Sequence, residues 1–282
     1  MKNLLVCIDG SRYGQVVCRY AAWLAQESEA TIELLYVTDL RQFEVPAIGD
    51  LSGSLGIQPF EGMITHLQEV EKVKAKFIGE QAMQVFSAAG LSNHTSFKHE
   101  TGLLVDVIKD YSSEVDLILL GKRGENAGFA SEHLGSMLER VVRSARVPCF
   151  VGNRDYREPS KIAIAHDGGD SCQKALDYIC MLAPIFRVRQ VHVLTCVEGH
   201  NEDLASDRLA DAEEQLGSVG IHPNCEMLSG VVEHAIANYV TDAGIDLLVL
   251  GAYGHSRIRE LLIGSTTTEL IRSCHVPVLC FR

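Results

Sequence analysis

Short apolar runs alternate with amphipathic stretches along the 282 residues of the chain. The apolar runs lack the alternation of a half-exposed strand, which is typical of a parallel sheet covered on both faces. The stretches between them have apolar residues at helical spacing. The pattern in the first part of the chain predicts strands at residues 4–8, 31–37, 95–98, 115–120 and 147–151 and helices at 11–26, 62–89, 103–111 and 134–143. This alternation predicts a doubly wound α/β fold with right-handed crossovers.

The same pattern occurs twice in the chain. Residues 4–11 align with 162–169, residues 115–121 with 245–251, and residues 146–151 with 275–280. The offset between the copies falls from about 158 to about 130, so the first copy has roughly 28 extra residues, which include the loop at 41–60. A repeat of this length predicts two similar units. We expect one domain at residues 1–153 and another at 160–282, joined by a short polar linker.

Two prolines bear on how these domains meet. Pro148 and Pro277 fall within the last expected strand of each copy. Proline cannot donate to a ladder, so these strands are expected at sheet edges. An exposed apolar edge favours pairing with a similar edge. We therefore expect an intramolecular pseudo-dimer through the two final strands, and a further homodimer stays open.

Composition limits the function classes. The net charge of −12 argues against nucleic acid as the main partner. No apolar run reaches the roughly 18 residues that a membrane-spanning helix needs. The N-terminal segment is expected to be a first strand rather than a secretion signal, so we expect a cytoplasmic protein. The nine cysteines include no Cys-x-x-Cys pair and are expected to be reduced thiols, and neither they nor the dispersed histidines suggest a metal site.

The most specific motif follows the apolar run at residues 245–250. It consists of Gly251-Ala252-Tyr253-Gly254, nine further residues, and then Gly264-Ser265-Thr266 before a helix-like stretch. Glycines let a backbone approach a ligand closely. Free amides at the start of a helix are a ready site for phosphate. The loops after the first and fourth strands of a doubly wound sheet lie at the switch point, so Asp167 and this glycine loop are expected around one crevice.

The order of Asp167, the glycine loop and a closing Val-Pro-Val strand resembles the universal stress protein family in its tandem form. The resemblance covers the chain except residues 41–60, and it implies two Rossmann-like domains of the adenine nucleotide alpha hydrolase-like fold. It also implies a stress-response regulatory protein that binds ATP or another adenine nucleotide. Carried over by position, the phosphate side would comprise Gly251, Gly254, Gly264, Ser265, Thr266 and Thr267, and the adenosine side would comprise Ala165, His166, Asp167 and Cys196.

The first copy departs from this motif. Gly121-Lys122-Arg123-Gly124 is present, but ten residues precede Gly135-Ser136, and Met137-Leu138 replaces the pair of threonines. Glu125 and Glu132 in this loop would disfavour a triphosphate. We therefore expect one intact nucleotide site in the second domain and a degenerate loop in the first.

Fast hydrolysis is not expected. The chain has no Walker loop, and no residue stands out as a base or an arginine finger, so no catalytic residue is assigned and at most a slow ATPase is expected. Mg²⁺ would accompany the nucleotide. Two alternatives stay open. One is a nucleotide-independent interaction module that docks an unknown protein partner. The other is an adenylating enzyme related to PP-loop pyrophosphatases, suggested by residues 166–171.

Overall fold

The computed structural model describes residues 1–39, 60–124, 136–182, 188, 190–197, 201–251 and 265–282. The N-terminal half contains β1 (Asn3–Cys7), α1 (Arg12–Ser28), β2 (Thr31–Thr38), α3 (Phe60–Ala88), the short 3₁₀ helix η2 (Ser92–His94), β3 (Thr95–Thr101), α4 (Leu104–Tyr111), β4 (Leu117–Gly121), α5 (Ser136–Ser144) and β5 (Cys149–Gly152). The C-terminal half contains β6 (Lys161–Ala165), α6 (Asp170–Leu182), β7 (Gln190–Val197), α7 (Glu202–Gly217), β8 (Asn224–Ser229), α8 (Val232–Asp242), β9 (Leu247–Gly251), α9 (Ser265–Ser273) and β10 (Val278–Phe281).

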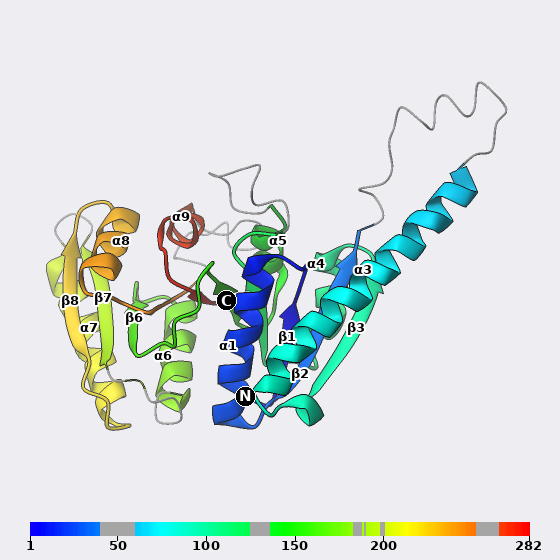
Figure 1. Cartoon of the computed structure of the whole chain (residues 1–282). Helices are drawn as coiled ribbons and strands as arrows, with labels where there is room; N and C mark the ends of the chain where they lie inside the picture. The colour runs from blue at the N-terminus through cyan, green and yellow to red at the C-terminus, as the bar shows by residue number, and fades with distance from the viewer. Residues whose placement is uncertain (40–59, 125–135, 183–187, 189, 198–200, 252–264) are drawn as a thin grey trace, which may run out of the picture.

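The described strands form one ten-stranded sheet in the order β3-β2-β1-β4-β5-β10-β9-β6-β7-β8 (Figure 1). All neighbouring pairs are parallel except β5 and β10, which pair antiparallel with Cys149 opposite Cys280. Each half therefore has the same doubly wound strand order, and the two halves are related by a reversal of direction at the centre of the sheet. This is the α/β class expected from the alternating pattern.

The final strands begin later than the sequence predicts. Pro148 and Pro277 lie directly before β5 and β10 rather than within them. Their carbonyl oxygens accept from the backbone amides of Ile118 and Leu248, each at 3.1 Å. The prolines thus supply acceptors to the neighbouring parallel strands, while their missing amides fall outside the ladder between the halves.

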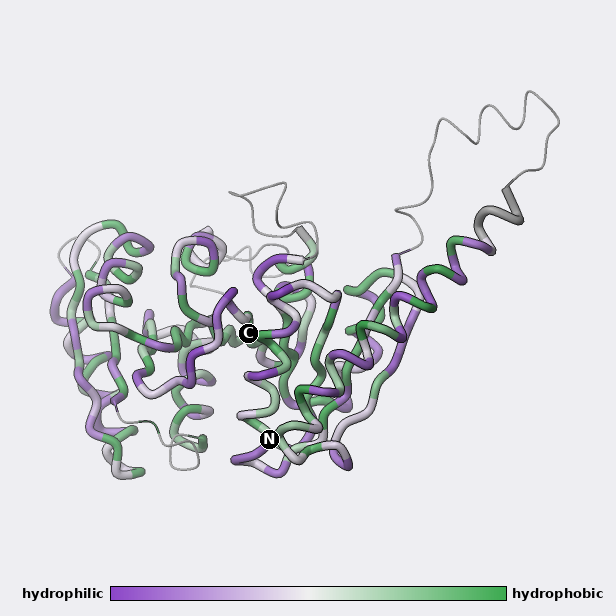
Figure 2. Tube along the Cα trace, viewed as in Figure 1, coloured by the Kyte–Doolittle hydropathy of each residue, from purple (hydrophilic) through white to green (hydrophobic). Residues whose placement is uncertain are grey.

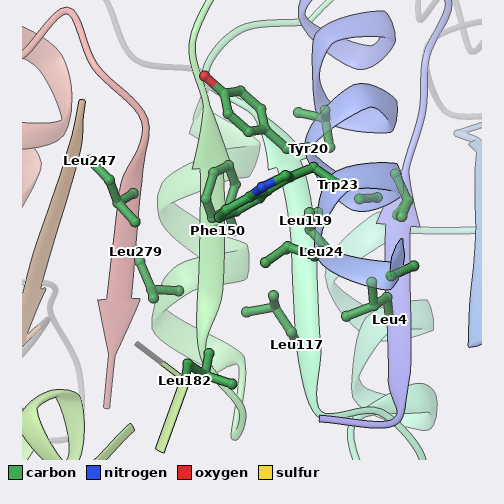
Figure 3. Close-up of a cluster of buried hydrophobic side chains, with 14 of the residues drawn as sticks. Leu4, Tyr20, Trp23, Leu24, Leu117, Leu119, Phe150, Leu182, Leu247 and Leu279 are labelled. Carbon is green, nitrogen blue, oxygen red and sulfur yellow. The ribbon is translucent and has the colours of Figure 1, made fainter. Parts of the chain in front are cut away.

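Helices cover both faces of the sheet. One buried core includes residues of α1, α3, α6 and α7, and a second includes residues of α4, α5, α8 and α9. The first core runs across the junction, where Trp23 of α1 and Phe150 of β5 lie near Leu247 and Leu279 of the other half (Figure 3). The halves consequently share apolar packing as well as a strand ladder.

The long helix α3 carries its apolar residues in a periodic pattern. Figure 2 shows hydrophobic and hydrophilic residues alternating along it. Ala75, Ile78, Ala82 and Phe86 are buried and belong to the core beneath this helix. Their spacing of three or four residues places them on one face, which explains why this stretch forms a helix covering the sheet.

Candidate functional site

The switch point of the C-terminal half lies at the carboxyl end of β6. The last residue of this strand, Ala165, pairs with Leu194 of β7 on one side and with Leu250 of β9 on the other. Parallel strands place their carboxyl ends at one edge of a sheet. The turn containing Asp167, the end of β7 and the end of β9 at Gly251 are therefore brought to the same edge, as the sequence predicted for Asp167 and Gly251.

A carboxylate organises the turn after β6. The Oδ1 atom of Asp167 accepts from the amide of Gly169 at 2.8 Å. Gly168 has a φ of +78°, a conformation that other residues rarely adopt. The carbonyl of Gly169 then accepts from the amides of Cys172 and Gln173, both at 3.0 Å, in the first turn of α6. Asp167 thus turns the chain so that the N-terminal end of α6 lies at the carboxyl edge.

His166 is a buried residue in this turn. Its amide donates to the carbonyl of Leu194 at 2.8 Å, and its carbonyl accepts from the Thr195 hydroxyl at 2.9 Å. The residue is 7% exposed, and neither ring nitrogen has a hydrogen-bond partner in the described part of the chain. Burial lowers the pKa of His166, against the opposing effect of the nearby Asp167 carboxylate. The ring is therefore held mainly in its neutral form.

Gly251 ends β9 where no larger residue fits. A Cβ atom at this position would lie 2.9 Å from both the Sγ of Cys172 and the Cβ of Ser171. The carbonyl of Gly251 accepts from the Thr267 hydroxyl at 3.4 Å, and the Cys172 thiol donates to the carbonyl of Ala165 at 3.3 Å. The first turns of α6 and α9 are thereby attached to the ends of β6 and β9.

The start of α9 supplies polar groups at this edge. Ser265 is exposed, Thr266 is half-buried and Thr267 is buried. The first turn of α9 contains no acidic residue, whereas that of α5 contains Glu139. A helix N-terminus without a carboxylate favours an anion. The positively polarised start of α9 can therefore attract a phosphate group, whereas the first turn of α6 contains Asp170.

The remaining expected site residues are placed less completely. Cys196 is half-buried near the end of β7, one strand away from Ala165. Gly254 and Gly264 lie outside the described residues, as do the loop positions 255–263 between them. The structure thus brings together Ala165, His166, Asp167, Gly251 and Thr267, with Ser265 and Thr266 at the start of the adjoining helix.

In the N-terminal half, the turn after β1 at Asp9 is equivalent to the Asp167 turn, and other parts of the protein lie close to it. The Oδ1 atom of Asp9 accepts from the amide of Ser11 at 3.0 Å. A Cβ atom at Gly124 would lie 3.0 Å from the Oδ2 of Asp9, and one at Gly121 would lie 2.7 Å from the Cβ of Tyr13. The chain after β4 therefore packs directly against the turn.

Lys122 of that motif has a structural contact. Its side chain is buried, and its Nζ donates to the carbonyl oxygen of Cys274 in the other half at 2.8 Å. Burial lowers the pKa of Lys122 to about 8, with Arg123 acting in the same direction. The lysine that the sequence places beside a phosphate loop instead connects the two halves.

Arg208 lies beside the Asp167 turn, although the sequence pattern gives no sign of it. A Cβ atom at Gly168 would lie 2.6 Å from the Nε of Arg208 on α7, whereas one at Gly10 would lie 2.9 Å from the Cδ1 of Ile78 on α3. Arg208 thus occupies the place in the C-terminal half that Ile78 has in the N-terminal half. The extra residues between the second strand and its helix in the first copy obscure this equivalence in the sequence.

The described residues contain neither a metal cluster nor a membrane-spanning helix. No group of three or more His, Cys, Asp or Glu side chains is arranged to hold a metal ion among the residues that the structure describes. Within those same ranges, no helix combines the length and apolar character required to cross a bilayer. All nine cysteines are free thiols.

Comparison with known proteins identifies the family. The model of the universal stress protein family matches residues 1–151 and again residues 159–282. Universal stress protein Slr1230 of a Synechocystis species is 39% identical, with all of both chains covered. A universal stress protein structure from Archaeoglobus fulgidus covers 99% of this chain and 98% of its own, with a TM-score of 0.75 and 22% identity. A shorter universal stress protein, solved in complex with cAMP, covers 45% of this chain and 98% of its own, with a TM-score of 0.38 and 21% identity. The chain belongs to the universal stress protein family and contains two matches to it in tandem.

Proposed function

We propose that this tandem universal stress protein binds ATP, or another adenine nucleotide, in its C-terminal half. The observation that carries the proposal is the meeting of three features at one edge. The Asp167 turn, the crowded Gly251 and the first turn of α9 are linked by hydrogen bonds from Cys172 to Ala165 and from Thr267 to Gly251. Together they offer a carboxylate-stabilised turn, close backbone approach and a helix N-terminus.

The phosphate end of the nucleotide is assigned to α9. Amides of its first turn and the exposed Ser265 hydroxyl would hold phosphate oxygens, with Thr266 beside them. Thr267 acts differently, because its hydroxyl is buried and directed to the carbonyl of Gly251. It would position the start of the helix for the ligand. Gly254 and Gly264 complete this proposal from the sequence motif alone.

The adenosine end is assigned to the ends of β6 and β7. Ala165, His166 and Asp167 line the β6 side of the switch point, and Cys196 lies toward the end of β7. Mg²⁺ would bind as the companion of the phosphates, since oxygen ligands suit this ion. The chain supplies binding groups without a Walker lysine, so we propose slow hydrolysis at most.

The N-terminal half is assigned a supporting role. Gly124 lies against its turn at Asp9, and the Lys122 ammonium donates to the carbonyl of Cys274. We propose that the two halves act as an intramolecular pseudo-dimer, with residues 1–153 as the partner domain and 160–282 as the nucleotide domain. A bound nucleotide would order the surface around the start of α9, which a protein partner of the cytoplasmic stress response could then recognise.

Isothermal titration calorimetry with Mg-ATP tests the proposal. Ser265→Ala should weaken ATP binding by roughly tenfold, because it removes one hydroxyl donor to a charged oxygen. Ser136→Ala, at the same position of α5, is the matched control and should leave the affinity within about twofold. ADP, AMP and cAMP are titrated alongside to define the preferred nucleotide.

The outcomes separate the candidate functions. Absence of heat and of any thermal shift at millimolar nucleotide would overturn nucleotide binding and favour an interaction module. Equal losses in Ser136→Ala and Ser265→Ala would contradict the assignment to the C-terminal half. Release of pyrophosphate coupled to transfer of AMP would instead support an adenylating enzyme.

A further inference from the structure

A second concave surface lies on the N-terminal half, between the helices α4 and α5. It is a cavity of about 590 Å³ whose lining includes five basic side chains: Lys109, Arg140, Arg143, Arg146 and Arg282. Asp106 is the one acidic residue of the lining in the described part of the chain. The whole chain has a net charge of −12, so this positively charged surface differs in sign from the protein as a whole.

The basic groups are held by contacts that leave positive charge uncompensated. Arg282 of the C-terminal half extends to α5, where its Nη1 donates to the carbonyl of Arg143 at 3.0 Å. Lys109 pairs with Asp106 at 2.9 Å. Within the described ranges, no carboxylate lies at ion-pair distance from Arg140 or Arg146, and both are exposed. Two guanidinium groups therefore remain available to a ligand.

The equivalent surface of the C-terminal half has different chemistry. The helices α5 and α9 have the same length, and the fifth residue is Arg140 in one and Glu269 in the other. Glu269 accepts two hydrogen bonds from Arg272, at 2.7 and 2.9 Å, which neutralises that position. The buried Ile108 and Ile236 mark equivalent positions of α4 and α8, and the residues that follow them are Lys109 and Ala237. Two halves of one fold thus differ in charge at the same place.

The cavity at the junction between the halves also contains cations, and Arg157 and Lys122 among them have partners. Arg157 lies 2.8 Å from the buried Asp246, and Lys122 donates to the carbonyl of Cys274 at 2.8 Å. These contacts account for Arg157 and Lys122 without a ligand, and Asp155 and Asp246 bring negative charge into the same lining. The α4/α5 surface has no such explanation for Arg140 and Arg146.

The shape and the rest of the lining favour a small ligand. Leu103, Val105 and Met137 form an apolar part of the wall beside the arginines. Guanidinium groups bind phosphate oxygens in paired hydrogen bonds. We propose that the α4/α5 cavity is a second binding site, separate from the carboxyl edge of β6 and β9, for a small ligand with two or more phosphate groups. Arg140 and Arg146 bind the phosphates, and Arg143 and Arg282 complete the positive wall.

The test uses the full chain and inorganic tripolyphosphate, which has the charge of the ligand class but no base. Wild-type protein is titrated by calorimetry at about 50 mM salt, where surface charges are weakly screened. Arg140→Glu and Arg146→Glu should each weaken binding by roughly tenfold. Arg140→Glu is compatible with the helix, because α9 has Glu at this position with Arg three residues later.

Two controls make the result specific. Lys72→Glu changes the net charge by the same amount on the exposed surface of α3 and should leave binding within about twofold. Ser265→Ala, which alters the nucleotide site, should leave the part of tripolyphosphate binding that depends on Arg140 and Arg146 unchanged. Failure of the α4/α5 site and failure of the nucleotide site are therefore distinguishable. Unchanged affinity in both arginine variants would overturn the proposal. Arg140-dependent binding of a polyglutamate peptide, without binding of tripolyphosphate, would overturn it in favour of an acidic protein partner.

Discussion

The ammonium group of Lys122 in the N-terminal half donates to the backbone carbonyl of Cys274 in the C-terminal half, at 2.8 Å. This contact lies beside the ladder between β5 and β10, and it buries a side chain that ordinarily remains in water. Removing an ammonium from water disfavours its charged form. The pKa of Lys122 is accordingly lowered to about 8, chiefly by burial.

Lys122 should make stability depend on alkaline pH. Its pKa is about 8 in the folded protein against an ordinary value of 10.5, so the unfolded chain binds more protons between these values. The contribution of Lys122 to the free energy of unfolding therefore rises from pH 8 to pH 10. The free energy of unfolding of wild type, relative to that of Lys122→Met, should therefore increase by on the order of 2 kcal/mol over this range. Urea titrations at pH 7, 8, 9 and 10 measure it.

The comparison with Lys122→Met is needed because the buried thiols act in the opposite direction. Burial raises the pKa of Cys7 and of Cys280 to about 12, so stability from these groups is lost as the pH rises above 9. Both proteins contain the same thiols, so the effect of Cys7 and Cys280, whose pKa values do not depend on Lys122, cancels in the difference. A difference that stays constant across the range would show that Lys122 is not buried as described.

Gly251→Ala should destabilise the C-terminal half. The added Cβ would meet the Cys172 Sγ and the Ser171 Cβ at 2.9 Å, so α6 must shift from β9. Forced overpacking of this kind costs about 1–3 kcal/mol. Gly217→Ala is the control, because nothing lies within 4 Å of its added Cβ, and replacing glycine in α7 should be neutral or stabilising by about 0.5 kcal/mol. Equal thermal shifts in the two variants would contradict the described packing.

The fold was largely predictable because apolar periodicity reports on burial directly. The expected helix at 62–89 corresponds to α3 at Phe60–Ala88, and the expected strand at 31–37 to β2. Boundaries near proline were wrong by a few residues, because a proline carbonyl can join a ladder while its nitrogen stays outside it. The third strand was predicted at 95–98 but extends to Thr101, since β3 is a polar strand with little apolar signal.

The site was predictable only in part. Asp167 and Gly251 stand next to strand ends, so chain order placed them at one edge. Arg208 and the arginines of the α4/α5 cavity come from helices, and their neighbours depend on which helix covers which strand. The charge difference between Arg140 and Glu269 is recognised only when the equivalent helices α5 and α9 are compared position by position.

Asp246→Ala should cost more stability than Asp116→Ala, although the two residues are at equivalent positions of the repeat, each between an apolar residue and a leucine. The buried Asp246 accepts from the amides of Ser160 and Lys161 at 3.2 and 3.0 Å and contacts Arg157 at 2.8 Å. Its loss leaves the half-buried amides of Ser160 and Lys161 without their acceptor, at a cost of about 2–4 kcal/mol.

The control position is exposed. Asp116 accepts from the amides of Lys2 and Asn3 at 2.5 and 3.0 Å, and water can replace it there. Asp116→Ala should cost about 1 kcal/mol in the same denaturant titrations. Equal costs would mean that the contacts of Asp246 with the connecting segment, residues 153–160, do not stabilise the protein.

The thiols of Cys149 and Cys280 should report the separation of the two halves. They are opposite each other in the β5–β10 ladder, the one ladder that joins the halves among the described strands. Burial raises the pKa of both thiols, so neither forms the reactive thiolate at pH 8. Labelling with iodoacetamide, followed by mass spectrometry, should modify the half-buried Cys180 well before this pair. Low urea should accelerate labelling of Cys149 and Cys280 together, because opening the ladder exposes both. Labelling of the pair at the rate of Cys180 in native buffer would contradict a closed junction between the halves.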